Sequence, residues 1–474
     1  MAAHEPPKPL PAVVTTSPSP TTAAPATEKP TSSPSNTSLQ LPTSTADLRA
    51  PPPKGFSVRP AGESGRSGFH PFHFLRITFK SSSWLCRVVN VLWPVVPVAI
   101  AVRYATDNHL AIFILSYLAM VPCANLLGFA GQELARKVPH VFGVLTETTL
   151  GSLVEIILFM VLIRRSGEDG VNYIQVIKAA ILGSVLATML LCLGLCFVVG
   201  GLKRHESTFN EAVSETGSGL LLIAGFGLAI PTVFAHSLDG RLGEADLVRK
   251  ALEISRSTAV LLMISYLVFV FFQSNTHHGI YDAIFVEEEL RDDDRHRDMM
   301  RHRLTFTEVV IALAISIGLV AIIAIILVDQ IHYLVVERHV SDAFVGLILV
   351  PLVEKAAEHL TAVDEAYDNQ MNFALSHVLG ATLQTALFNG PLVVIVGWGL
   401  GKPMGLDFEI FDLAMLILAI LAVGNFLRDQ KSNYLEGALC VIIYVGIAVA
   451  ALHYPNPEHG GEHGAAAGAD AGAH

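Results

Sequence analysis

Long apolar runs separated by short polar segments fill the chain from residue 88 onward. A helix needs about 20 predominantly apolar residues to cross the hydrocarbon core of a bilayer. Eleven runs approach or reach that length, at residues 88–104, 110–129, 142–163, 174–200, 217–235, 257–273, 307–328, 343–363, 373–398, 411–427 and 434–452. The pattern predicts an all-α polytopic membrane protein with about eleven transmembrane helices, one leading helix followed by two sets of five.

One of these runs carries ionisable residues at its centre. Glu354, Lys355, Glu358 and His359 lie within residues 346–363. An ionisable group at bilayer depth costs a few kcal/mol or more unless it faces a partner, water or an ion. Glu354 and Glu358 lie one turn apart, where a proton, a lysine or a metal cation would relieve their repulsion. Lys355 can reach Glu358 at i, i+3, so a structural salt bridge is the alternative to an ion site.

A second acidic run lies in a matching place earlier in the chain. A fixed offset that carries residue 346 back to 143 also lays Glu358 on Glu155. A helix rich in small residues follows each acid, starting at Gly183 and at Gly380. The number of spans between the acids places the two helices in opposite senses across the membrane. The chain therefore predicts two inverted five-helix repeats, with an ion site at the midplane between them.

Composition and the apolar runs together predict how the chain is divided into segments. The predicted parts are a disordered Pro/Ser/Thr-rich tail at 1–68, a leading transmembrane helix at 88–104, a first repeat at 110–273, an acidic linker at 274–306, a second repeat at 307–452 and a disordered Gly/Ala/His-containing tail at 453–474. The first tail shows no cleavable signal-peptide pattern. Arg76, Lys80 and Arg87 precede the first span and predict a cytosolic N-terminus.

Charge and cysteine usage narrow the function classes. Half of the residues are hydrophobic (52%), which excludes a soluble enzyme. The net charge of −11 argues against nucleic acid as a partner. The five cysteines form no CxxC pair and are expected to be small buried hydrophobes. The charged stretch at 286–303 is either a solvated linker or a surface that attracts cations.

Several ordered segments carry a resemblance to a known family. They are PLVEKAAEHLTAV from Pro351, GATLQTALF from Gly380, GWGLGKPM from Gly397 and NYLEG from Asn433, with LLGFAGQELA and LCLGLCFVVGG in the first half. Over about residues 110–455 the chain resembles the cation/proton exchangers of the sodium/calcium exchanger superfamily, and fungal vacuolar calcium/proton exchangers in particular. The resemblance implies the sodium/calcium exchanger fold.

The resemblance also implies which residues form the site. The family signatures read GNAVE and GNAAEH, and their glutamates are the central cation and proton groups. By position these are Glu155 and Glu358, followed by His359, while the family's second-half glutamine falls on Gln384. Ca²⁺ takes six to eight hard oxygen ligands, so carbonyls and hydroxyls such as that of Thr382 are expected to support the carboxylates.

The chain departs from the signatures at six positions. Ser152 and Glu147 stand where the first signature region has Asn, and Leu153 stands where it has Ala. Thr188 replaces an Asn in the helix that follows, and Glu354 and Lys355 replace Gly and Asn in the second signature. If Lys355 pairs with Glu354, the other glutamates, Glu147 included, remain free to hold a divalent ion, and we favour this alternative. If Lys355 points into the site, it repels Ca²⁺, and the substrate is monovalent or transport is lost.

The predicted function is calcium/proton antiport by alternating access, which moves cytosolic Ca²⁺ into an acidic compartment across the vacuolar membrane. The alternatives are a monovalent-cation or Mn²⁺/proton antiporter and a transport-dead regulatory homologue. An enzyme is disfavoured, since Glu358 and His359 lack the HExxH pattern of a zinc hydrolase. The expected partners are Ca²⁺, protons and membrane lipid, without a cofactor, and the oligomeric state stays open.

Overall fold

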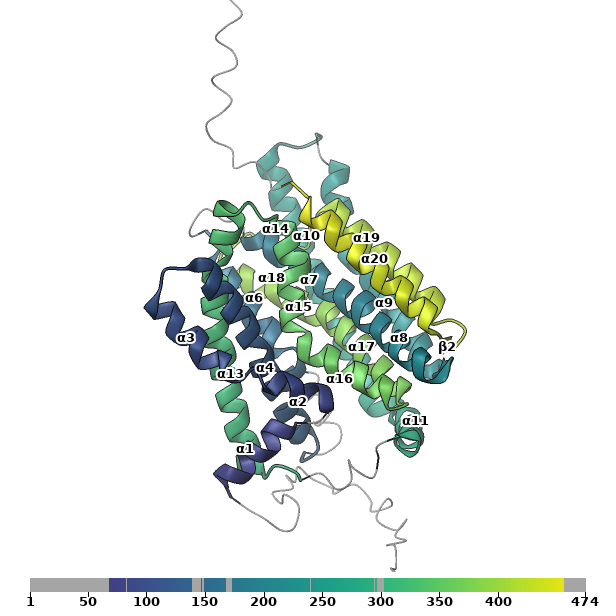
Figure 1. Cartoon of the computed structure of the whole chain (residues 1–474). Coiled ribbons are helices and arrows are strands. Elements are labelled where there is room, and N and C mark those ends of the chain that lie inside the picture. Colours follow the sequence, from purple (N-terminus) through teal and green to yellow (C-terminus); the bar gives the residue numbers. More distant parts are fainter. Residues whose placement is uncertain are drawn as a thin grey trace, which may run out of the picture. The chain divides into compact units, whose positions relative to one another are not determined.

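A computed structural model describes residues 68–81, 83–138, 146, 149–167, 173–238, 240–293, 295 and 302–455. Helices make up most of the described chain (Figure 1), and the two-residue strands β1 (Ser207–Thr208) and β2 (Lys431–Ser432) pair antiparallel. The predicted tails at 1–68 and 453–474 lie almost entirely outside the described residues, as does Glu147.

The α-helices follow the predicted apolar runs. In chain order they are α1 (Pro71–Lys80), α2 (Trp84–Asn90), α3 (Val95–Ala105), α4 (His109–Ala135), α6 (Leu153–Arg165), α7 (Tyr173–Leu186), α8 (Leu193–Arg204), α9 (Glu211–Leu238), α10 (Glu244–Phe271), α11 (His278–Arg291), α13 (Phe306–Asp329), α14 (Asp342–Phe344), α15 (Val350–Glu354), α16 (Ala356–Tyr367), α17 (Met371–Gln384), α18 (Gly390–Gly399), α19 (Ile410–Phe426) and α20 (Tyr434–Leu452). Short π-helical segments η3 (Ala187–Cys192), η4 (Phe272–Thr276), η5 (Tyr333–Glu337), η6 (Val345–Leu349) and η7 (Thr385–Asn389) interrupt or extend them.

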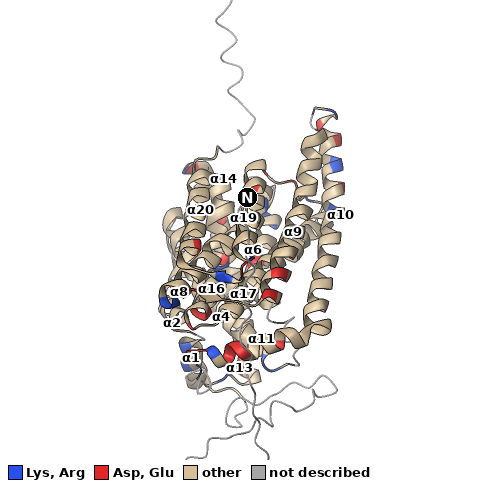
Figure 2. Ribbon diagram, turned by 90° about the vertical axis from the view of Figure 1, so that its right-hand side faces the viewer, with Lys and Arg blue, Asp and Glu red and all other residues tan. Residues whose placement is uncertain are grey.

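Nine of the eleven predicted spans correspond to continuous apolar helical stretches. Within the described residues, eight stretches are long and apolar enough to cross a membrane: Trp84–Ala105, His109–Ala135, Tyr173–Arg204, Glu211–Leu238, Glu244–Thr276, Phe306–Glu337, Met371–Gly399 and Tyr434–Leu452. The ninth is the shorter α19. Charged residues lie mainly towards the ends of long helices, as at the tip of α9 and α10 and around α11 and α13 (Figure 2).

The two remaining spans are the ones that carry the acids, and neither is one uninterrupted helix in the described part. In the first, residues 149–151 are helical, Ser152 interrupts the helix as a turn, and α6 begins at Leu153. The second is divided into η6, α15 and α16, with an interruption at Lys355, whose ψ of −3° departs from the helical value near −42°. Irregular backbone at membrane depth is tolerated where it lines a cavity or is buried in protein.

The two halves of the chain repeat the same order of elements. The composite helix α7–η3–α8 in the first half corresponds to α17–η7–α18 in the second, and the π-helical segment lies in the same place in both. A shift that lays Gly183 on Gly380 also lays Thr188 on Thr385. Both composite helices are largely buried, which places them at the centre of the fold.

The halves interlock through close backbone packing between α7 and η6. A Cβ atom added to Gly183 would overlap the backbone carbonyl of Leu347, and one added to Gly346 would lie 2.6 Å from Ala179 Cβ. Only residues without a side chain allow this approach. The small-residue helix of the first repeat is thereby fixed against the acidic segment of the second.

The beginning of the predicted linker is a docked helix. In α11 the carboxylate of Glu288 is 2% exposed and accepts hydrogen bonds from the backbone nitrogen (3.1 Å) and Nδ2 (2.8 Å) of Asn372, at the start of α17. Asp293, just beyond α11, accepts from Lys203 Nζ (2.8 Å) and Arg204 Nη2 (2.7 Å) at the end of α8. This part of the acidic stretch therefore ties the first repeat to the second.

Replacing Asp293 with Asn tests this contact, since the hydrogen bond from Lys203, aided by that from Arg204, lowers the pKa of the Asp293 carboxyl. A lowered folded-state pKa gives stability that is present above the ordinary Asp value near 3.9 and is lost as the pH falls through the folded-state pKa. The carboxylate is 44% exposed, so the loss in Asp293→Asn should be below about 1 kcal/mol at pH 7. Thermal unfolding at pH 7 and pH 3 should show the difference from wild type shrinking at the lower pH, whereas a constant difference would contradict the ion pair.

Candidate cation-binding site

Glu155 lies at the centre of a buried polar cluster, in the first turn of α6, and is 1% exposed. Its Oε2 accepts hydrogen bonds from Thr385 Oγ1 at 2.9 Å and from Asn389 Nδ2 at 2.6 Å, both on η7 of the second repeat. The ammonium of Lys355 lies 2.9 Å from the same oxygen. The other oxygen, Oε1, has no hydrogen-bond partner among the described residues.

Lys355 joins the acids of the two repeats. Its side chain is 1% exposed, and its Nζ also lies 3.3 Å from Glu358 Oε2. The other oxygen of Glu358 lies against Gly151, where an added Cβ would be 3.2 Å away. Glu155 and Glu358 therefore share one pocket, with the ammonium of Lys355 between them.

Glu354 lies beside this pair but not in it. The residue is 2% exposed, and neither carboxylate oxygen makes a hydrogen bond within the described chain. The expectation that Lys355 pairs with Glu354 is wrong, because the ion pairs of Lys355 join it to Glu155 and Glu358. The helix is interrupted at Lys355, and in this arrangement its side chain extends to Glu155 and Glu358.

Further predicted residues form two contacts between the repeats. Gln384 Nε2 donates to Ser152 Oγ at 2.8 Å. Thr188 Oγ1 lies 3.3 Å from His359 Nε2 and donates to its own helix at Ser184 O (2.8 Å). These four residues are buried.

Thr382, another predicted residue, uses its hydroxyl for a hydrogen bond within its own helix. Its hydroxyl donates to the carbonyl of Val378 in its own helix, at 2.7 Å. Glu147 lies outside the described residues.

Thr385 and Asn389 were not among the residues predicted for the site. The repeat offset that pairs Thr188 with Thr385 was available in the sequence as a signal. Asn389 lies four residues after Thr385 and so shares its face of the helix. Both are fully buried, and their donors fix the carboxylate of Glu155.

The cluster offers oxygen atoms suited to a hard cation. Glu155 Oε1, both oxygens of Glu354 and Asn389 Oδ1 have no hydrogen-bond partner in the described part of the chain. In the present arrangement, however, no group of three His, Cys, Asp or Glu among the described residues is spaced to hold a metal ion. Counted as three carboxylates and one ammonium, the cluster has a formal charge of −2, which one divalent cation or two protons would balance.

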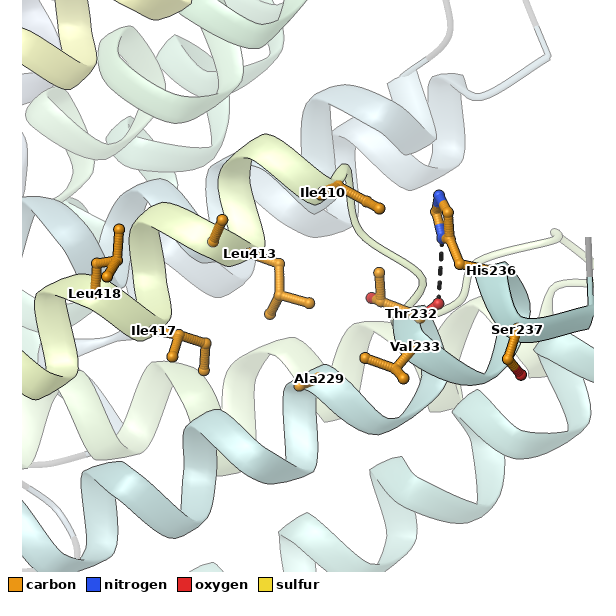
Figure 3. A pocket seen from close by; sticks show the side chains of 10 residues that line it. Ala229, Thr232, Val233, His236, Ser237, Ile410, Leu413, Ile417 and Leu418 are labelled. Atoms are coloured by element: carbon orange, nitrogen blue, oxygen red, sulfur yellow. Dashed lines mark hydrogen bonds between the residues drawn. The ribbon is translucent and has the colours of Figure 1, made fainter.

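A wide groove elsewhere on the molecule has a different character. It lies between α9 and α19, has a volume of about 740 Å³ and is lined largely by apolar side chains such as Leu413 and Ile417 (Figure 3). At the edge of the groove, His236 Nδ1 forms a hydrogen bond of 3.2 Å with the carbonyl oxygen of Thr232 in its own helix. The described residues that line the groove include no Asp or Glu, unlike the cluster around Glu155.

Comparison with known proteins decides the family. The sequence pattern of the sodium/calcium exchanger proteins matches residues 108–275 and 308–452, which is more than half of the chain. The chain belongs to the sodium/calcium exchanger family. The matched ranges contain both buried acids, and the resemblance predicted from the signatures is confirmed.

Related proteins match most of this exchanger. A vacuolar calcium ion transporter of Schizosaccharomyces pombe is 32% identical over 77% of this chain and 85% of its own length. Vacuolar cation/proton exchanger 5 of Arabidopsis thaliana is 32% identical over 79% of this chain and 82% of its own length. The solved structure of native YfkE is 27% identical, with a TM-score of 0.63, and covers 77% of this chain and 99% of YfkE.

A second solved structure supports the fold. The H⁺/Ca²⁺ exchanger CAX matches with a TM-score of 0.53 over 80% of this chain and 91% of its own, at 14% identity. The prediction of an all-α exchanger fold with a leading helix and two inverted repeats is confirmed.

Proposed function

We propose that this exchanger is a calcium/proton antiporter that moves cytosolic Ca²⁺ into an acidic compartment. The observation that carries the proposal is the buried pocket in which Glu155 and Glu358, one from each repeat, approach the same ammonium group. Intramembrane carboxylates that face the interior of a bundle mark ion and proton pathways. The names of the relatives, calcium ion transporter and cation/proton exchanger, agree with this assignment.

Competition for the carboxylates couples the two fluxes. A proton on Glu155 or Glu358 removes a negative charge from the cation site, and a bound cation in turn disfavours the proton. The pocket therefore holds either the cation or protons. When it opens alternately to the two sides of the membrane, a proton gradient drives the cation the other way.

The gradient and the location follow from the same proposal. The relatives with vacuolar names support the vacuolar membrane, whose lumen is acidic. The basic residues Arg76, Lys80 and Arg87, ahead of the first span, support a cytosolic N-terminus. In that orientation the antiporter would lower cytosolic Ca²⁺ at the expense of the lumenal proton gradient. The proposed partners are Ca²⁺, protons and lipid.

Flux measurements in proteoliposomes test the proposal. Purified exchanger in vesicles with an acidic lumen is expected to take up Ca²⁺ and release protons, with Na⁺ and K⁺ in excess failing to substitute. Proton release driven by Na⁺, K⁺ or Mn²⁺ in place of Ca²⁺ would identify a different antiporter. The absence of any cation-dependent proton flux would indicate a transport-dead homologue. This is the second candidate function, because an ammonium group lies inside the pocket.

Asn389→Ala is expected to weaken Ca²⁺ transport about 10- to 100-fold, since it removes the short hydrogen bond to Glu155 Oε2. A hydrogen bond to a charged group contributes about 1.5–3 kcal/mol. The loss should fall on the apparent Ca²⁺ affinity, measured from the concentration dependence of uptake. Asn425→Ala, at an exposed position on α19, is the matched control and should behave as wild type. Equal affinities in the two variants would remove Asn389 from the site.

A further inference from the structure

The ammonium of Lys355 lies where a transported cation would be expected. It is 2.9 Å from Glu155 Oε2 and 3.3 Å from Glu358 Oε2, and it is shielded from solvent. Its charge is that of a monovalent ion, and its stem keeps it in the pocket. The site is therefore already occupied by a covalently attached cation before any substrate arrives.

An attached cation has a large advantage over a free ion of the same charge. Tethering gives a group an effective concentration in the millimolar range or above without any new contact. Na⁺ or K⁺ offers the carboxylates the same single charge as the ammonium, and so gains little by displacing it. A divalent cation doubles the attraction to each carboxylate at the same distance.

The structure also offers the displaced ammonium an alternative partner. Glu354 precedes Lys355 in the chain, is buried and has no hydrogen bond to either carboxylate oxygen within the described residues. A buried carboxylate that forms no ion pair is costly. If Lys355 turned from Glu155 and Glu358 to Glu354, it would neutralise that carboxylate and free two acids for the incoming ion.

We propose that Lys355 is the specificity-determining residue of the transport site, a tethered monovalent cation that divalent ions displace onto Glu354 and that Na⁺ and K⁺ do not. This inference rests on the proposed antiport and specifies its substrate class as divalent. Lys355 acts as a charge filter, and Glu354 is the acceptor that makes its displacement possible.

The proposal predicts opposite effects for the two residues. Lys355→Met keeps the length of the side chain but removes the competitor, so Ca²⁺ should bind about tenfold or more tightly, and Na⁺ and K⁺ should now compete. Lys355→Arg keeps the charge and should exclude monovalent ions as the wild type does. Glu354→Gln removes the acceptor and should weaken Ca²⁺ binding about tenfold. In the Lys355→Met background the same Glu354→Gln change should have little further effect.

Titration calorimetry measures these effects independently of transport. Ca²⁺ is titrated into the purified full-length protein with and without 100 mM Na⁺ or K⁺. Unchanged Ca²⁺ affinity and continued exclusion of Na⁺ in Lys355→Met would overturn the filter. An equal effect of Glu354→Gln in both backgrounds would overturn the acceptor role. Should Lys355→Met fail to fold, the double variant Lys355→Met/Glu354→Gln, which restores the pocket charge of −2, carries the test of monovalent competition.

Failure of the inference and failure of the proposed function are distinguishable. Wild-type protein without Ca²⁺-dependent proton flux contradicts the antiport itself. Wild-type flux combined with a Lys355→Met variant that still excludes Na⁺ and K⁺ contradicts only the filter.

Discussion

Replacing Glu155 with Gln should reduce Ca²⁺-driven proton release by about a hundredfold or more. Glu155 Oε2 accepts from Thr385 and Asn389 and contacts the ammonium of Lys355. Gln removes the charge that the ammonium requires, and breaking a buried ion pair by removing one partner costs about 3–5 kcal/mol. In the proposed antiport, the carboxylate ligand for the cation and the group that carries the proton are lost together. Proton release on Ca²⁺ addition to proteoliposomes measures the effect.

A matched control separates this result from a general effect of losing an acid. Glu215 is exposed on α9, so Glu215→Gln should retain wild-type exchange. Glu358→Gln should resemble Glu155→Gln, because both acids contact the same ammonium. Near-normal exchange in Glu155→Gln, with the variant folded and reconstituted at the wild-type level, would remove Glu155 from the central role.

Gly183→Ala should have the largest effect on stability. The new Cβ would overlap the backbone of Leu347 in η6, and backbone cannot rotate away as a flexible side chain can. Overpacking a close contact costs about 1–3 kcal/mol and occasionally more, and we expect the upper end of that range or beyond here. Because η6 leads into the acidic segment, the displacement should also reduce transport. Thermal unfolding in detergent measures the stability.

Gly219→Ala is the matched control, since Gly219 lies within α9 and its added Cβ meets nothing within 4 Å. In a helix interior Ala is more stable than Gly by about 0.5–1 kcal/mol, so this variant should unfold at or above the wild-type temperature. If Gly183→Ala unfolds at the same temperature as Gly219→Ala, the close packing of the two repeats at η6 is contradicted.

Much of the fold could be predicted from the sequence because a bilayer imposes a simple length rule on apolar runs. The two runs around Glu155 and Glu358 depart from that rule, and the departure itself marks the site. Their ionisable residues interrupt the apolar pattern, and the helix that carries Lys355 is interrupted in the structure. The docking of α11 was not predictable, since the partner of Glu288 is Asn372, 84 residues away.

The two glutamates of the candidate site could be predicted from the sequence, but the contacts that join them could not. The repeat offset identifies Glu155 and Glu358 as equivalent, and the structure brings them to one pocket. Which acid Lys355 contacts depends on the direction in which its side chain leaves an interrupted helix, and sequence spacing does not specify that direction. Asn389 binds Glu155 across 234 residues, so only the three-dimensional arrangement reveals it as a partner.

The account depends on a pocket in which metal and protons exclude each other. Calorimetric titration of the purified protein with Ca²⁺, repeated in buffers of different ionisation enthalpy, counts the protons released as the cation binds. We predict net proton release in wild type and a smaller release in Glu155→Gln where residual binding is measurable. Ca²⁺ binding without any proton release in the wild-type protein, at a pH where exchange is active, would contradict the account.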